Sequence, residues 1–538
     1  MALPHPECDI IYSDTCIGIV PISRDAAALT TLGKSLTERG EYRRAVVALR
    51  AASTCSRENA NCLHHLASAL LSAGNPEEAA DCFERALKLE PARLESWQLL
   101  GTTYLDHLNR PEDAFRGFRR SIELRPDVSQ TYQSAARCWL NGCTPEAAAT
   151  RLRDLLPPGT DALQIRRGVG RALIETGRYE EALEVFHAMV RESPNDAASL
   201  KSLGQLYLGL RDVRSAGHYF DRAVAGCGND SEVLIGYLLY CVKLGDLDRA
   251  RCFYASRQHD LPDLSDAETP VWRGQDLHGK TLRLIVGDLY YGDAFQFVRF
   301  ARAVKQLGAR VIVEGPRRIR SLLHTVPGID LAVAPHDPLP HCDYRAVAFW
   351  LLFAWEIPLG EMGDPAPYIQ SAPELRSKWR GKFQGAPSFK IGIVWRGSSY
   401  QQWNRYACRS IPLRELRPLA AIPGVTLYSL QVEPGLAELT QSDPPFRAVD
   451  LRPDFPNTAA AMDELDLVVT VDTSIAHLAG ALGKPTYVLL PYDACFRWML
   501  DCNETPWYPN LRLFRQSTPG QWTDVVAAAG RAVSELLA

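Results

Sequence analysis

The sequence predicts a protein of two parts: an all-helical array of repeats, followed by an α/β region made of two successive parallel-sheet units. Three observations predict this class. A period of about 34 residues runs from about residue 26 to 258; strand-like runs alternate with helix-like runs after Lys280; and a charged stretch with prolines and glycines interrupts that alternation at 371–388. The length of 538 residues agrees, because single cores rarely grow beyond about 250–300 residues.

Composition narrows the class of partner. The formal net charge of −4 leaves no basic excess to neutralise nucleic-acid phosphates. No run approaches the roughly 18 consecutive apolar residues of a membrane span, and residues 1–25 lack the basic start and long apolar stretch of a secretory signal, so we expect a cytoplasmic protein. The fourteen cysteines include no Cys-x-x-Cys, and no paired Cys/His spacing predicts a metal site.

Small residues mark the repeats in the N-terminal half. One series, with gaps of 34 or 35 residues, is Ala45, Ala79, Ala114, Ala148, Ala182, Ala216 and Ala250. The stretch 94–126 adds Trp97, Leu100-Gly101, Tyr104, Phe118 and Pro126, and this pattern resembles the tetratricopeptide repeat. About seven copies should form a solenoid whose concave face binds a peptide or partner protein; dimerisation or mere support of the second half is the alternative. In the fourth copy, Pro157-Pro158 should end the second helix.

The second half alternates strands with helices. The expected strands are 281–288, 309–315, 389–397, 425–431, 465–471 and 486–490, and the expected helices include 293–308, 316–326 and 522–538. Such alternation implies parallel sheets covered on both faces. Two such units in tandem place a cleft at the carboxyl ends of their strands.

The corner Asp472-Thr473-Ser474 lies where a strand meets a short helix. Thr473 or Ser474 should cap that helix, which leaves the following backbone N–H groups free to bind an anion such as phosphate. His477, in the first turn, is placed to donate to the same anion. The alternative is an ordinary capped helix with a structural histidine. Gly480 should permit close backbone packing.

Several motifs carry a family resemblance. "YGDAFQFVRFARAVKQLGA" (291–309) and "VDTSIAHLAGALGKPT" (471–486) resemble motifs of the ADP-heptose:lipopolysaccharide heptosyltransferase family, and "IGIVWRGS", "CRSIPLRELRPL" and "LYSLQ" follow the family's order between them. The chain resembles bacterial proteins in which tetratricopeptide repeats precede such a transferase, and its domain order also resembles O-GlcNAc transferase. The resemblance implies a GT-B glycosyltransferase of two Rossmann-like lobes, inverting and metal-independent, with a nucleotide-sugar as substrate and no cofactor.

The resemblance also implies domain boundaries. They are an N-terminal segment (1–25), a repeat solenoid (26–258), a linker (259–280), a GT-B N-terminal lobe (281–370), an inter-lobe linker (371–388) and a nucleotide-sugar-binding C-terminal lobe (389–538).

The family's functional residues carry over by position. Asp293 would be the general base, provided that its carboxylate faces the cleft unpaired; the other interpretation is a helix N-cap. Arg409 falls where relatives usually place a lysine on the donor phosphates, a change that phosphate chemistry tolerates. The remaining donor-site candidates are Ser398, Ser399, Asp472, Thr473, Ser474 and His477.

Three further residues are candidates for the acceptor side or the cleft: Tyr290, Gln296 and Arg396. Tyr290 stands where relatives usually have glycine, so it would narrow the cleft beside the proposed base. Arg396 replaces a small residue, and it is a candidate contact to an acidic sugar.

These expectations favour transfer of a sugar to a Ser or Thr hydroxyl of a protein that the repeats recruit, with flagellin or an adhesin as a plausible acceptor. An arginine or asparagine acceptor stays open. The alternatives are transfer to lipopolysaccharide or another glycan, and a non-catalytic scaffold with a degenerate transferase fold, for which Tyr290 is the main support.

Overall fold

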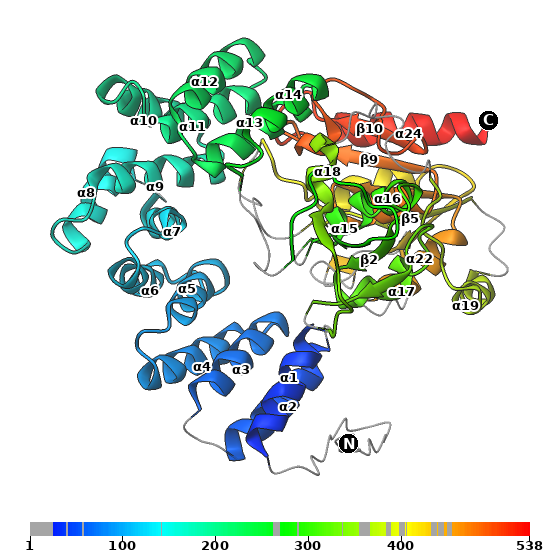
Figure 1. Ribbon diagram of the computed structural model, residues 1–538, viewed down its shortest axis with the longest axis horizontal. Coiled ribbons are helices and arrows are strands. Elements are labelled where there is room, and N and C mark those ends of the chain that lie inside the picture. Colours follow the sequence, from blue (N-terminus) through cyan, green and yellow to red (C-terminus); the bar gives the residue numbers. More distant parts are fainter. Residues whose placement is uncertain are drawn as a thin grey trace. The chain divides into compact units, whose positions relative to one another are not determined.

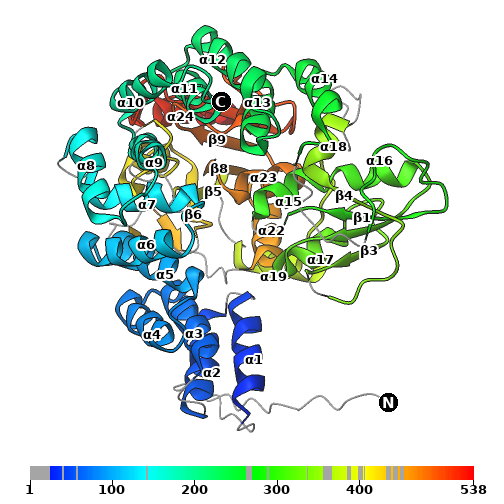
Figure 2. The same cartoon turned by 60° about the vertical axis from the view of Figure 1, so that its left-hand side comes forward.

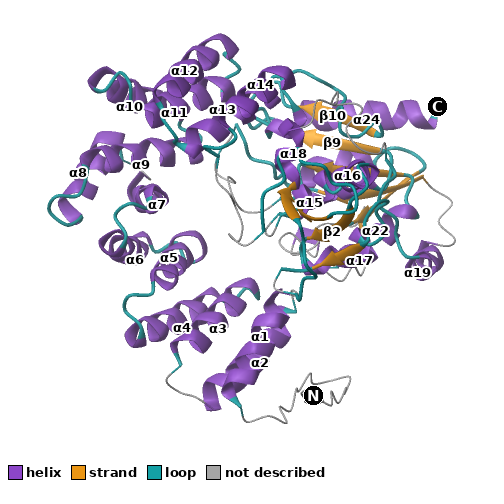
Figure 3. Ribbon diagram, in the orientation of Figure 1, coloured by secondary structure: helices purple, strands orange, loops and turns teal. Residues whose placement is uncertain are grey.

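The computed structural model describes residues 25–38, 41–55, 59–140, 143–261, 269–287, 290–335, 337–354, 366–383, 389–397, 404, 406–431, 438–439, 446–448 and 454–538. It divides into two compact units. The described residues up to Ile174, with Arg178–Met189, form the first unit, and Glu175–Gly177 with Val190–Ala538 form the second. Figure 1 colours the chain along its sequence, and Figure 3 shows that all strands follow the helical half. None of the helices in the described part has the length and hydropathy that a bilayer crossing requires.

In the described part of the chain, fourteen helices form the repeats, two to each repeat. They are α1 (Ala26–Glu38), α2 (Tyr42–Cys55), α3 (Ala60–Ser72), α4 (Pro76–Leu89), α5 (Leu94–Thr102, extended by the π-helical turn Thr103–His107), α6 (Pro111–Leu124), α7 (Ser129–Leu140), α8 (Pro145–Leu155), α9 (Ala162–Glu175), α10 (Tyr179–Glu192), α11 (Ala197–Gly209), α12 (Val213–Gly226), α13 (Ser231–Lys243) and α14 (Leu247–Arg257). As expected, α8 ends just before Pro157-Pro158.

The recurring glycines let the two helices of a repeat touch. A Cβ atom at Gly101 would lie 2.7 Å from Phe118 of the paired helix, and one at Gly204 would lie 2.8 Å from Phe220. Both rings are buried. The 34-residue period of small residues therefore reflects a ring packed directly on backbone in each of these repeats.

The first sheet has four parallel strands in the order β3-β2-β1-β4. They are β1 (Thr281–Ile285), β2 (Arg310–Glu314), β3 (Leu331–Val333) and β4 (Tyr344–Val347). Their helices are α15 (Tyr291–Phe297), α16 (Phe300–Gln306), α17 (Arg320–Leu323, after a 3-10 turn at Arg317–Ile319) and α18 (Ala348–Ala354).

The helix predicted over 293–308 is interrupted between α15 and α16. Arg299 Nε donates to the carbonyl of Gln296 at 2.8 Å, which is the group that an unbroken helix offers to residue 300. The buried guanidinium thus replaces one helical hydrogen bond.

The second sheet has six parallel strands in the order β10-β9-β8-β5-β6-β7. They are β5 (Phe389–Val394), β6 (Val425–Ser429), β7 (Phe446–Ala448), β8 (Leu467–Val471), β9 (Thr486–Leu490) and β10 (Leu511–Arg515). Numbered from β5, this is the 3-2-1-4-5-6 order of a doubly wound fold, whose direction reverses between β5 and β8. The predicted fold class, a helical repeat solenoid followed by two Rossmann-like lobes, is confirmed.

Further helices accompany this sheet: α19 (Pro373–Phe383), α20 (Arg417–Ala420, after a 3-10 turn at Leu413–Leu416), α22 (Phe455–Asp463), α23 (Ser474–Ala481), the 3-10 turn η5 (Phe496–Trp498) and α24 (Thr523–Leu537). The terminal helix α24 buries Val525, Val526 and Val533 in the core beneath this sheet, as its sequence predicted.

The last two repeats share a core with the α/β region. Leu208, Phe220 and Leu247 belong to the same buried cluster as the first sheet. Lys243, at the end of α13, forms an ion pair with Asp493, and both side chains are largely buried. These contacts lie within the second unit, so the last repeats and the α/β lobes are one packed body there.

We expect Gly204→Ala to destabilise the second unit by about 1–3 kcal/mol, because the added methyl group overlaps the buried Phe220 ring. The measurement is the free energy of unfolding in urea. Gly381→Ala is the matched control, since a Cβ there meets nothing within 4 Å and should stabilise α19 by up to about 1 kcal/mol. Equal stability of both variants would refute the close packing.

Candidate functional site

The site lies where the two sheets present the carboxyl ends of their central strands. α15 follows β1, and α23 follows β8, and these two helices pack on each other (Figure 2). A Cβ atom at Gly292 would lie 3.0 Å from His477 Cδ2 and 3.8 Å from Ser474 Cα. The missing side chain of Gly292 therefore lets the start of α15, which carries Asp293, pack against the start of α23. Both strand ends are the switch points at which doubly wound folds bind ligands.

Thr473 caps α23. Its hydroxyl accepts a hydrogen bond from the backbone N–H of Ile475 at 3.3 Å, and Ser474 is the first helical residue. Of the two caps that the sequence allowed, the structure selects Thr473.

Asp472 and Arg409 meet at this corner. Asp472 is only 4 % exposed, and its Oδ2 has no hydrogen-bond partner among the described residues. Arg409 Nη1 lies 3.8 Å from that oxygen and donates to the Asp472 carbonyl at 3.3 Å. A Cβ at Gly397, which follows β5, would lie 3.7 Å from Arg409 Cβ. A cation is thus fixed between the two strand ends that flank the switch point.

His477 is buried in the first turn of α23. Its Nδ1 lies 3.2 Å from the Tyr508 hydroxyl, and its ring stacks on Trp498 with centroids 5.1 Å apart. Burial, and then the positive charges of Arg497, Arg299 and Arg409, hold the pKa of His477 well below its usual value. The imidazole is therefore neutral at neutral pH.

Gly480 makes the position of Tyr508 possible. A Cβ at Gly480 would lie 2.4 Å from the Tyr508 ring, so this glycine permits the close packing that the sequence predicted.

Asp293 is paired, contrary to the condition set by the sequence analysis. Its carboxylate forms an ion pair with Arg497, and the two side chains are 27 % and 19 % exposed. The N-cap interpretation is wrong: Tyr290 occupies the N-cap position of α15, and Asp293 is the third helical residue. The carboxylate of the proposed base is therefore held by the Arg497 guanidinium.

Arg497 is the functional candidate that the sequence analysis missed. It lies in η5, which follows β9, and Arg497 Nη1 donates to Cys495 Sγ at 2.8 Å. Burial lowers the pKa of Arg497, but the nearby Cys495, Asp293 and Asp472 raise it above its usual value, so the side chain stays cationic. Because 204 residues separate it from Asp293, local spacing gave no signal of the pairing.

A second buried arginine joins the lobes beside His477. Arg299 Nη1 donates to the Trp507 carbonyl at 2.7 Å, and Nη2 donates to the Tyr368 hydroxyl at 3.0 Å. Its guanidinium also lies 4.7 Å from the centre of the Tyr508 ring. Arg299 thus connects α15 with the segment before α19 and the segment before β10.

The remaining candidates have different surroundings. Gln296 is fully buried, and neither its Oε1 nor its Nε2 has a partner among the described residues. Tyr290 is 71 % exposed. Arg396 Nε lies 2.6 Å from Glu438 Oε1, so it already has an acidic partner. Ser398 and Ser399 lie outside the described residues.

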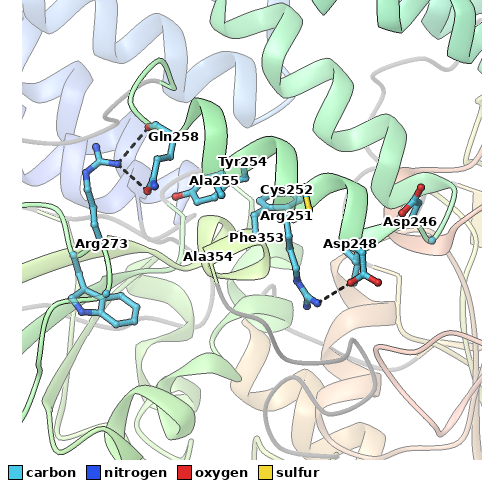
Figure 4. A pocket seen from close by; sticks show the side chains of 14 residues that line it. Asp246, Asp248, Arg251, Cys252, Tyr254, Ala255, Gln258, Arg273, Phe353 and Ala354 are labelled. Carbon is cyan, nitrogen blue, oxygen red and sulfur yellow. Dashed lines mark hydrogen bonds and ion pairs between the residues drawn. The ribbon is translucent and has the colours of Figure 1, made fainter.

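A separate cavity of about 810 Å³ lies between α14 and α18 (Figure 4). Its polar side chains include one ion pair and one hydrogen bond to an amide: Arg251 lies 3.6 Å from Asp248, and Arg273 donates to Gln258 Oε1 at 3.3 Å. Asp246 accepts from the backbone N–H of Arg249 and so caps α14. None of the predicted site residues lines this cavity.

We expect the unfolding midpoint to fall as the pH drops below about 6.5, the unfolded pKa of histidine, because folded His477 resists the proton that the unfolded chain accepts. The stability is fully present above that pH. His477→Asn should lose less stability than the wild type between pH 7.5 and pH 5, measured by thermal unfolding.

Some pH dependence should remain in that variant, since burial also lowers the pKa of His64 to about 4. His278→Asn, at an exposed position, is the control and should behave as the wild type. A midpoint that falls equally in His477→Asn and the wild type would contradict a buried neutral imidazole.

The known proteins that resemble this chain match it over different lengths. Residues 60–93 and 145–197 match the tetratricopeptide repeat family. Protein FlbA of Caulobacter vibrioides is 23 % identical over 493 residues, which cover 79 % of this chain and 82 % of FlbA. Human anaphase-promoting complex subunit 7 is 23 % identical over 184 residues, 34 % of this chain and 32 % of that protein.

Two solved structures also match. An O-GlcNAc transferase mutant from Thermobaculum terrenum covers 95 % of this chain and 91 % of its own, with 13 % identity and a TM-score of 0.41. YrrB, described as a TPR protein with an unusual peptide-binding site, covers 39 % of this chain and 90 % of its own, with 19 % identity and a TM-score of 0.22. Because residues 60–93 and 145–197 match the repeat family, the N-terminal half of the chain carries tetratricopeptide repeats, as its period predicted.

Proposed function

We propose that the protein is an inverting glycosyltransferase that moves a sugar from a nucleotide-sugar to a hydroxyl group of a protein. One observation carries the proposal: Arg409 and the capped N-terminus of α23 lie at the switch point of the second sheet, and α15, which carries the Asp293 carboxylate at the switch point of the first, packs on α23. Such a pair separates the two tasks of the reaction. One lobe holds an anionic leaving group, and the other receives a proton.

The donor side is built from Arg409 and the start of α23. A guanidinium suits phosphate because it donates two parallel hydrogen bonds, and the backbone N–H groups of the first helical turn favour the same anion. Neutral His477 adds a donor: when Nδ1 accepts from the Tyr508 hydroxyl, Nε2 carries the proton. These groups would stabilise the charge that develops on the diphosphate as its bond to the sugar breaks.

The acceptor side is Asp293. In the proposed reaction an acceptor hydroxyl oxygen attacks the anomeric carbon, its proton passes to the Asp293 carboxylate, and the bond to the diphosphate oxygen breaks. Attack from the face opposite the leaving group inverts the anomeric centre. A general base of this kind contributes about 10²–10⁴-fold to the rate.

The repeats favour a protein acceptor. Stacked helical repeats expose a long surface that suits an extended polypeptide, and the last two repeats share a core with the lobes that carry the site. A Ser or Thr of flagellin or an adhesin fits this proposal; a glycan acceptor gives the repeats no role. The Asp293–Arg497 ion pair is the observation that favours the second candidate, a non-catalytic scaffold.

We expect the protein to bind one of UDP, GDP, ADP, CMP and dTDP, measured by calorimetry. Arg409→Ala should weaken that binding about 10–100-fold, since charge-assisted hydrogen bonds contribute about 1.5–3 kcal/mol. Arg409→Lys should retain more of the affinity than Arg409→Ala. Arg414→Ala removes an exposed guanidinium nearby and should leave binding unchanged. Absence of binding by every nucleotide would favour the scaffold.

Asp293→Ala should decrease the rate of sugar transfer by at least about 100-fold without loss of nucleotide binding. The readout is the intact mass of a co-expressed acceptor protein, which gains one sugar with the wild-type enzyme. Transfer at the wild-type rate by Asp293→Ala would remove Asp293 from the mechanism and leave the donor site intact.

A further inference from the structure

We propose that Arg497 masks Asp293 in the free protein and transfers to the diphosphate of the donor when the donor binds, which releases the carboxylate to act as base. This inference rests on the proposed function. It assigns a function to the Asp293–Arg497 ion pair, which otherwise argues against catalysis.

Arg497 is placed to reach both partners. Its guanidinium contacts Asp293 of α15, and the charge of Asp472, at the corner beside Arg409, also acts on it. Arg497 Nε is buried without a hydrogen-bond partner among the described residues. One N–H of this guanidinium therefore has hydrogen-bonding capacity left.

The backbone around Arg497 is fixed, so the exchange needs only its side chain. The Arg497 carbonyl accepts a hydrogen bond from Trp507 Nε1 at 2.8 Å, and Trp498 is fully buried. On the other side, Lys243 of the last repeat pairs with Asp493, and Gly245 lies against Met499. The last repeat thus holds the segment that carries Arg497.

Charge decides which partner Arg497 takes. A carboxylate carries one negative charge, whereas the diphosphate of a nucleotide carries at least two and offers several acceptor oxygens. The positive charges of Arg497, Arg299 and Arg409 all act on His477 in the first turn of α23, and Arg409 also contacts Asp472 beside that helix. A bound diphosphate would draw Arg497 away from Asp293, and the freed carboxylate could then accept the hydroxyl proton.

This exchange makes a specific prediction about Asp293. In the wild type a diphosphate must first break the ion pair, so its apparent affinity is reduced by that cost. Asp293→Asn removes the competing charge and should bind nucleoside diphosphate about 10-fold more tightly than the wild type. Arg497→Met should bind about 10–100-fold more weakly. The double variant should bind nucleoside diphosphate with the same affinity as Arg497→Met, because Asp293 cannot compete for a guanidinium group that is absent.

The experiment is calorimetry of these three variants, Arg497→Lys and the wild type with UDP, GDP, ADP and dTDP, and with sodium pyrophosphate as a probe that lacks a nucleoside. Thermal unfolding checks that each variant is folded. If Arg497→Met does not fold, Asp293→Asn and Arg497→Lys decide the question: tighter binding by Asp293→Asn, with partial retention by Arg497→Lys, supports the exchange.

Equal or weaker binding by Asp293→Asn would overturn the inference, because a merely structural ion pair gives loss of affinity, or none, when it is broken. If Arg409→Ala still weakens binding in that case, the proposed function stands without the exchange. If the wild type binds neither a nucleotide nor pyrophosphate, the proposed function itself fails.

Discussion

The close packing of α15 on α23 is the constraint on which the rest of the site depends. It exists because Gly292 has no side chain where His477 lies, and it joins the carboxyl ends of two separate parallel sheets. Two features of the site depend on this contact: α15, which carries Asp293, lies against the start of α23, and Gly292 covers His477. A side chain at residue 292 would separate the very groups that the proposed reaction brings together.

The electrostatics of the site follow from burial of several cations near few carboxylates. Arg299 is held by a carbonyl and a tyrosine hydroxyl, Arg409 by the corner of α23, and Arg497 by Asp293. Together with burial they keep His477 neutral. A buried guanidinium group is stable only when negative charge lies near it. A bound diphosphate would supply further negative charge at this site. The last repeat contributes through Lys243, which anchors the segment of Arg497.

Much of the fold could be predicted from the sequence because its signals are periodic. Glycines that pack on phenylalanine rings recur with the repeat, and β-branched runs mark β5, β8 and β9. Short strands such as β3 and β7, of three residues each, carry too few residues for such a pattern. At the site, the order of residues along the chain was enough to place Thr473 at the start of a helix and His477 in its first turn. The partner of Asp293 was not predictable, since a contact between α15 and η5 depends on how two lobes pack, and the single arginine of η5 resembles any other. Arg396 was expected to be available and instead pairs with Glu438 of the same lobe, a contact that no local spacing indicates.

A crystal structure with the preferred nucleoside diphosphate bound would test the account most directly. The account predicts phosphate oxygens within hydrogen-bond distance of Arg409 and of the first backbone N–H groups of α23, with Arg497 turned from Asp293 toward the diphosphate. A nucleotide bound elsewhere, for instance in the cavity between α14 and α18, would contradict the donor site. A diphosphate bound at the corner with Arg497 still on Asp293 would contradict the exchange.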